Sequence, residues 1–128
     1  MSEALFQFHA GWRYVVLVAG VVALLLPLFA LRSRTVGSGA LRAVRIFTIA
    51  LDVQLLAGVV LVFLRPFFPA LMGHILMMVA AVAVAHLLSV TLRRRPPERR
   101  TPAFIATGVG ICLLSIIAGI LSIGRPIV

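Results

Sequence analysis

The chain of 128 residues is 62% hydrophobic and only 12% charged. Its 12 basic residues are all arginines, and with only three acidic residues they give a formal net charge of +9. The length allows one domain, 1–128, and an apolar fraction above the roughly one half of soluble domains excludes a water-soluble enzyme, a disordered tail and a disulfide scaffold.

Apolar runs along the chain predict membrane-spanning helices. A spanning helix needs about 20 mostly apolar residues, and without water the backbone must satisfy its own hydrogen bonds within each segment, which favours helices over strands. The first run is expected to be a retained helix rather than a cleaved signal peptide, because residues 1–10 contain Glu3 and no arginine. The expected fold is an all-α, up-down four-helix bundle integral to the membrane, with helices at about 12–31, 46–64, 67–92 and 103–123.

The arginines predict the orientation of this bundle. They lie between the apolar runs rather than along one polar face, so nucleic acid is not an expected partner. The first connection holds Arg32, Arg34, Arg42 and Arg45, the third holds Arg93, Arg94, Arg95, Arg99 and Arg100, and the opposite side carries Arg13, Arg65 and Arg125. The positive-inside rule then places both termini outside the cytoplasm, in a multi-pass protein of a bacterial cytoplasmic (inner) membrane. The basic stretch at 93–100 could also hold anionic lipid headgroups, although topology alone is the favoured explanation.

Ionisable residues inside the apolar runs mark candidate sites, because each costs roughly 2.5 kcal/mol or more to place in hydrocarbon. Asp52 lies seven residues after Arg45, and His86 lies seven residues before Arg93. Both therefore lie about 10 Å from the basic side and are expected to meet. The pair is either a polar clasp between helices, or a carboxylate that orients an iron-binding histidine or takes part in proton relay with Thr107.

The other two histidines are predicted near the opposite surface. His74 is about 28 Å and His9 about 34 Å from the basic side, so a haem clamped between them is geometrically possible. Arg13 shares a helical side with His9, and with Arg65 it would pair with haem propionates; the alternative is that both are ordinary interfacial arginines. His74 and His86 are about 18 Å apart along one helix and cannot ligate the same iron.

Gln54 and Gly58 share one face of the second predicted helix. This spacing indicates a tight helix contact or an interface between copies of the chain.

Three stretches carry a resemblance to a known group of proteins. They are FHAGWRYVVL at 8–17, LDVQLLAGVVL at 51–61 and GHILMMVAAVAVAH at 73–86. Together they resemble small bacterial four-helix membrane proteins labelled cytochrome b-like. The resemblance implies haem b held by transmembrane histidines, with His9, His74 and His86 as ligand candidates and Arg13 near the propionates. Three histidines allow at most one bis-histidine haem per chain.

The leading functional hypothesis is a haem b-binding integral membrane protein, either a one-electron carrier or a haem-holding subunit. Its iron would be held by His74 with His9, or by His86 with an unidentified partner, and electrons would pass to a quinone or a partner membrane subunit. The alternative is a cofactor-free structural or assembly subunit of a larger membrane complex. A third hypothesis is a proton or small-solute pathway through Asp52, His86 and Thr107, which would need a homo-oligomer. No catalytic motif is present, so catalytic activity of its own is not expected.

Overall fold

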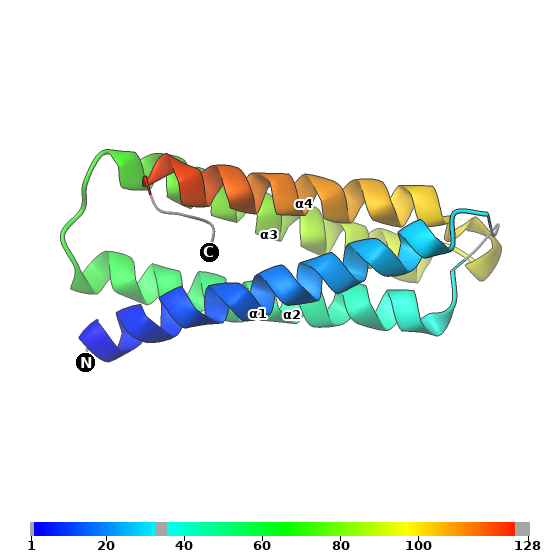
Figure 1. Cartoon of the computed structure of the whole chain (residues 1–128), viewed down its shortest axis with the longest axis horizontal. Helices are drawn as coiled ribbons and strands as arrows, with labels where there is room; N and C mark the ends of the chain where they lie inside the picture. The colour runs from blue at the N-terminus through cyan, green and yellow to red at the C-terminus, as the bar shows by residue number, and fades with distance from the viewer. Residues whose placement is uncertain (1, 33–35, 125–128) are drawn as a thin grey trace.

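The computed structural model describes residues 2–32 and 36–124, which contain α-helices and no strand. Within these ranges each helix runs antiparallel to the one before it (Figure 1), and each of the four long helices is apolar enough to cross a membrane. The described elements are α1 (Ser2–Phe29), α2 (Ser38–Leu64), α3 (Ala70–Arg94), a short 3-10 helix (Pro97–Arg99) and α4 (Pro102–Ser122). The all-helical prediction is therefore confirmed. The four long helices also have the length and apolar composition of membrane-spanning segments, as expected of a multi-pass membrane protein. Arg34 and Arg125, which the orientation prediction counts, lie outside the described residues.

The first two helices begin earlier than the sequence predicts. The helix α1 begins at Ser2 rather than near residue 12, and α2 begins at Ser38 rather than near residue 46. A run of uncharged residues predicts only the part of a helix that lipid would cover. The helical hydrogen bonds continue into the polar residues before that run. The side chain of Gln7 donates to Glu3 across one turn of this added part of α1, at 3.1 Å. The arginines of the first connection are thus partly helical, because Arg42 and Arg45 lie on α2.

The two ends of the bundle differ in chemistry. The basic end holds residues 30–32, 36–37 and 95–101, and the terminal end holds the start of α1, the connection 65–69 and the end of α4 (Figure 1). At the basic end the two connections are joined, because the Val36 amide donates to the carbonyl of Arg100 at 3.2 Å. The Arg100 guanidinium Nε donates in turn to the carbonyls of Leu92 and Arg95, at 2.9 and 3.2 Å.

The packed core lies mainly in the basic half of the bundle. The helix α1 packs chiefly on α2, and α3 chiefly on α4, while the contact between α2 and α3 is the least extensive of the neighbouring pairs. Buried core residues include Val16, Ala23, Val44, Phe47, Leu51, Ala85, Leu88, Ile105, Val109 and Cys112. The limited contact between α2 and α3 leaves room for cavities between these two helices.

Large apolar side chains cover the outside of the bundle. Leu56, Phe63 and Leu114 are 68%, 83% and 68% exposed, and many similar residues surround them. Soluble monomers rarely expose apolar surface on this scale. Hydrocarbon is the solvent that such a surface matches, because all backbone groups within the helices are already hydrogen-bonded.

Candidate functional site

His9 from α1 and His74 from α3 face each other in the terminal half of the bundle. Their ring centres are 6.4 Å apart, and the ring planes meet at 78°. Two imidazoles on opposite sides of one metal ion would have ring centres about 6 Å apart, since the metal–nitrogen bond is about 2 Å and each ring centre lies about 1 Å behind its nitrogen. The observed separation of the ring centres is close to this distance.

His74 is held through one of its two nitrogens. Its Nδ1–H donates to the backbone carbonyl of Gly119 on α4, at 2.9 Å. A neutral imidazole that donates through Nδ1 carries its lone pair on Nε2, which is the arrangement found in many metal-binding histidines. Gly119 permits this contact, since a Cβ there would lie 2.6 Å from Met78 Cε and 3.1 Å from Met77 Cβ.

His9 is positioned by α2. The side-chain amide of Gln54 donates to the backbone carbonyl of His9 at 3.0 Å. One turn further along α2, a Cβ at Gly58 would lie only 3.1 Å from His9 Cε1, so the absence of a side chain makes room for the ring. The shared face of Gln54 and Gly58 is therefore a tight contact with α1, which favours that alternative over an interface between copies.

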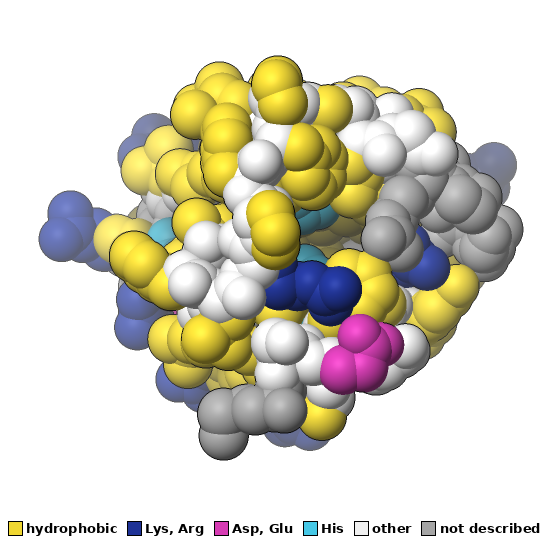
Figure 2. All heavy atoms as spheres, turned by 90° about the vertical axis from the view of Figure 1, so that its left-hand side faces the viewer, with side chains coloured by type: hydrophobic (Ala, Val, Ile, Leu, Met, Phe, Trp, Pro, Cys, Tyr) yellow, Lys and Arg dark blue, Asp and Glu magenta, His cyan; other side chains and the backbone are white. Residues whose placement is uncertain are grey.

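The two histidines border a cavity of about 350 Å³, within the usual range for ligand pockets. Its walls are mostly apolar residues of α2 and α3, including Leu55, Val62, Ile75 and Val79. Figure 2 looks onto the terminal end and shows histidine side chains beneath the outer surface, with arginine and acidic side chains beside the opening. The site is thus an apolar pocket with imidazoles inside.

Two arginines border the pocket region. Arg65 lines the cavity, stacks 4.4 Å above the ring of Phe6 and lies 3.8 Å from the carboxylate of Glu3. Arg13 lines an adjoining hollow of about 70 Å³ together with His9 and His74, and its Nη2 donates to the Tyr14 hydroxyl at 3.0 Å. Both predicted propionate partners therefore lie beside the histidine pair.

Buried polar atoms without hydrogen-bond partners cluster at this site. Among the described residues they are His9 Nδ1, Arg13 Nε and Gln54 Oε1, and all three residues line the smaller hollow. Buried polar atoms in proteins are nearly always satisfied by protein, water or ligand. Water or another polar group in this hollow would satisfy these three atoms. The sequence indicates Gln54 only as a packing residue, and its place beside His9 depends on how α1 and α2 pack.

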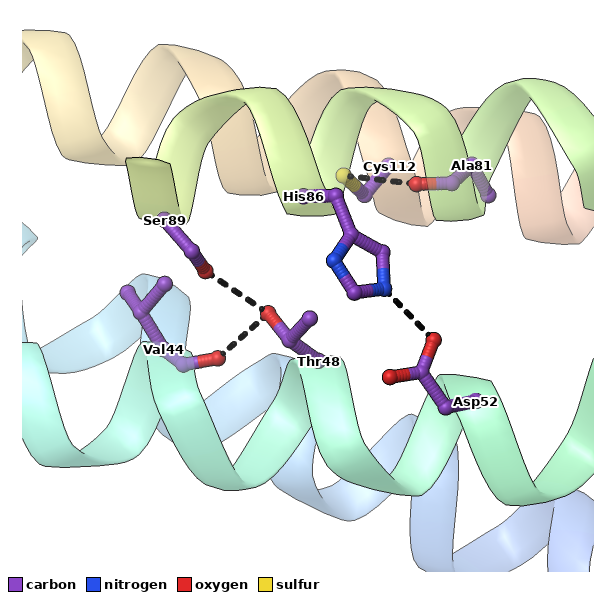
Figure 3. Close-up of polar contacts among 7 residues, drawn as sticks. All are labelled: Val44, Thr48, Asp52, Ala81, His86, Ser89 and Cys112. Atoms are coloured by element: carbon purple, nitrogen blue, oxygen red, sulfur yellow. Dashed lines mark hydrogen bonds and ion pairs between the residues drawn. The ribbon is translucent and has the colours of Figure 1, made fainter. Parts of the chain in front are cut away.

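Asp52 and His86 form a separate polar pair. The His86 Nε2–H donates to Asp52 Oδ1 at 2.7 Å, between α2 and α3 (Figure 3). The His86 and Asp52 side chains are 51% and 44% exposed, so the pair lies at the surface between two helices rather than inside the bundle. The Thr107 hydroxyl donates to the carbonyl of Ala103 in its own helix.

Within residues 2–32 and 36–124, no group of three or more His, Cys, Asp and Glu side chains is arranged to hold a metal ion. A metal ion bound by these side chains would therefore have at most two of them as ligands, such as His9 and His74.

No family model matches the chain, and no curated protein or solved structure matches it either.

Proposed function

We propose that this protein holds one haem b between His9 and His74 within the membrane and serves as a one-electron carrier or a haem-holding subunit. The observation that carries the proposal is the 6.4 Å separation of the two imidazole rings inside an apolar cavity. Bis-histidine ligation is one of the ways in which proteins hold haem iron, and iron so held supplies a one-electron redox step.

Each residue of the site has a defined part in this proposal. Gly119 orients the His74 ring and leaves Nε2 to bind iron, while Gln54 fixes the backbone at His9. Arg13 and Arg65 supply positive charge for the two propionates. Apolar walls from α2 and α3 exclude water, which favours binding of a flat apolar macrocycle.

The remaining parts of the proposal follow from charge and resemblance. The basic end would face the cytoplasm of a bacterium, because positively charged connections are retained there. The histidine pair would then lie near the outer surface, where a quinone or a partner membrane subunit exchanges electrons with it. The choice of haem b rests on the resemblance to cytochrome b-like proteins that the sequence leads us to expect.

Absorption spectroscopy tests the proposal. The full chain is produced with ample haem, purified in mild detergent and measured after air oxidation and after dithionite reduction. We expect sharp haem b bands in the reduced protein and one haem per chain. His9→Ala and His74→Ala should each abolish these bands, and added imidazole should restore part of them by entering the space left at the ligand.

His86→Ala is the matched control, because it removes a histidine from the same helix as His74 but outside the pocket. It should retain the haem spectrum. A colourless wild-type protein would contradict haem binding and favour the cofactor-free structural or assembly subunit. Loss of colour in His86→Ala together with retention in His74→Ala would contradict the ligand assignment.

A further inference from the structure

A second cavity lies between α2 and α3 at the basic end. Its volume is about 490 Å³, and it is separate from the histidine pair. Four of its lining residues are arginines: Arg42 and Arg45 from α2, Arg93 from α3 and Arg100 from the connection before α4. Arginines from three segments of the chain thus line one hollow.

These arginines have no acidic partner among the described residues. Glu3 lies near Arg65 at the other end of the bundle, and Asp52 is engaged by His86. Glu98 lines a different hollow. Four positive charges around one cavity repel each other, and the repulsion is relieved when an anion with several oxygens binds between them.

Hydrogen bonds join the two helices that form this groove. The hydroxyls of Thr48 on α2 and Ser89 on α3 are 3.1 Å apart (Figure 3), and Thr48 also donates to the carbonyl of Val44. Arg100 is fixed by its bonds to the carbonyls of Leu92 and Arg95. Contacts within the chain therefore set the positions of α2, α3 and Arg100.

The lining of the groove changes along the two helices. Arginines line the end nearest the connections, which is the mouth of the groove, and the walls include the apolar residues Leu41, Ile49 and Leu92. Asp52 with His86 lines the part nearer the middle of the bundle, seven residues beyond Arg45 or about 10 Å along the helix. The Asp52 carboxylate repels an anion from that part, so the anion stays among the arginines. A ligand that fills the groove therefore has an anionic head and an apolar body.

We propose that this groove binds an anionic phospholipid from the leaflet around the basic end. The lipid phosphate lies among Arg42, Arg45, Arg93 and Arg100, and the ester region and upper acyl chain lie along Ile49 and Leu92. Phosphate is recognised well by guanidinium groups, which donate two parallel hydrogen bonds to it. Free inorganic phosphate would use only the mouth of the groove and leave its apolar walls uncovered. This site does not depend on haem.

Lipid titration of the full chain in neutral detergent tests the proposal. Native mass spectrometry measures the lipid retained as dioctanoyl phosphatidylglycerol is added, and dioctanoyl phosphatidylcholine is the zwitterionic comparison. We expect the anionic lipid to bind at least about tenfold more tightly. The variant Arg45→Gln/Arg93→Gln should lose about tenfold in affinity, while Arg45→Lys/Arg93→Lys should keep most of it.

The matched control is Arg94→Gln/Arg99→Gln, which removes the same charge from the same end of the bundle but outside the groove. It should change the affinity less than about twofold. Equal losses in the two glutamine variants would overturn the proposal in favour of diffuse attraction to charge. Competition by inorganic phosphate at the concentration of the lipid would overturn the lipid assignment. Circular dichroism of each variant without lipid verifies that the helices remain folded.

Discussion

The two histidines of α3 differ in the nitrogen that each uses as a donor. His74 donates through Nδ1 to the backbone carbonyl of Gly119, whereas His86 donates through Nε2 to the carboxylate of Asp52. The first arrangement leaves the outer nitrogen of the ring for a metal, while the second uses that nitrogen to join two helices. The same residue type on one helix therefore makes two different contacts, and the neighbouring helix determines which nitrogen is used.

The contact between Asp52 and His86 should stabilise the pairing of α2 with α3. We expect Asp52→Ala and His86→Ala each to lower the free energy of unfolding in detergent. The double variant should lose less than the sum of the single losses, by about 1 kcal/mol, which is the size of interhelical hydrogen bonds in membrane proteins. Unfolding by increasing amounts of sodium dodecyl sulfate, followed by circular dichroism, measures the three values. If the loss in the double variant equals the sum of the two single losses, the contact contributes nothing to the free energy of unfolding.

Close approach of helices depends on glycines at particular positions. Gly20 on α1 lies where α2 and α4 meet it, because a Cβ there would be 2.6 Å from Leu113 Cδ2 and 2.9 Å from Phe47 Cε1. Phe47 is only 1% exposed and has little room to move. The close packing of α1, α2 and α4 at this point therefore requires glycine at position 20.

Gly20→Ala should therefore destabilise the bundle by about 1–3 kcal/mol, which is the usual cost of overpacking a core. Gly110→Ala on α4 is the control, because a Cβ at Gly110 meets nothing within 4 Å. The control should be as stable as the wild type or more stable by up to about 1 kcal/mol, because alanine favours a helix interior over glycine. Thermal unfolding in detergent compares them, and equal stability of the two variants would contradict the tight junction.

The whole molecule is unevenly packed along its length. Apolar side chains fill the basic half, while the terminal half encloses the cavity beside His9 and His74. Limited contact between α2 and α3 allows both this cavity and the arginine-lined groove to form between the same two helices. The extensive contacts of α1 with α2 and of α3 with α4 stabilise the bundle, and the looser boundary between α2 and α3 has space for a ligand in each half.

The distribution of arginines predicts how the whole molecule lies in its membrane. We expect both termini outside the cytoplasm, since the two arginine-rich connections are retained inside. A periplasmic phosphatase fused to the C-terminus should therefore be active, and a green fluorescent protein fused at the same point should be dark. An inactive phosphatase and a fluorescent green fluorescent protein would show that the C-terminus lies in the cytoplasm, contrary to this prediction. Replacing Arg93, Arg94 and Arg95 by glutamine should give a mixture of both patterns, because the charge asymmetry is then smaller.

Sequence alone determined the features that depend on distance along a single helix. The number of long apolar segments follows from their lengths, because each segment must match the thickness of the hydrocarbon by itself. The equal depths of Asp52 and His86 follow from the constant rise of the helix, and the structure brings them within hydrogen-bonding distance. The apolar runs did not predict the early starts of α1 and α2. Polar residues before each run are also helical, and they leave the length of the run unchanged.

Only the tertiary structure decided which way each side chain faces around its helix. Apolar residues surround every helix of this chain, so no polar stripe in the sequence marks an inner or an outer face. The meeting of His9 with His74, the bond from His74 to Gly119 and the surface position of Asp52 all depend on that rotation. Rotation is set by the fit of side chains between neighbouring helices, which is a property of the assembled bundle rather than of any one segment.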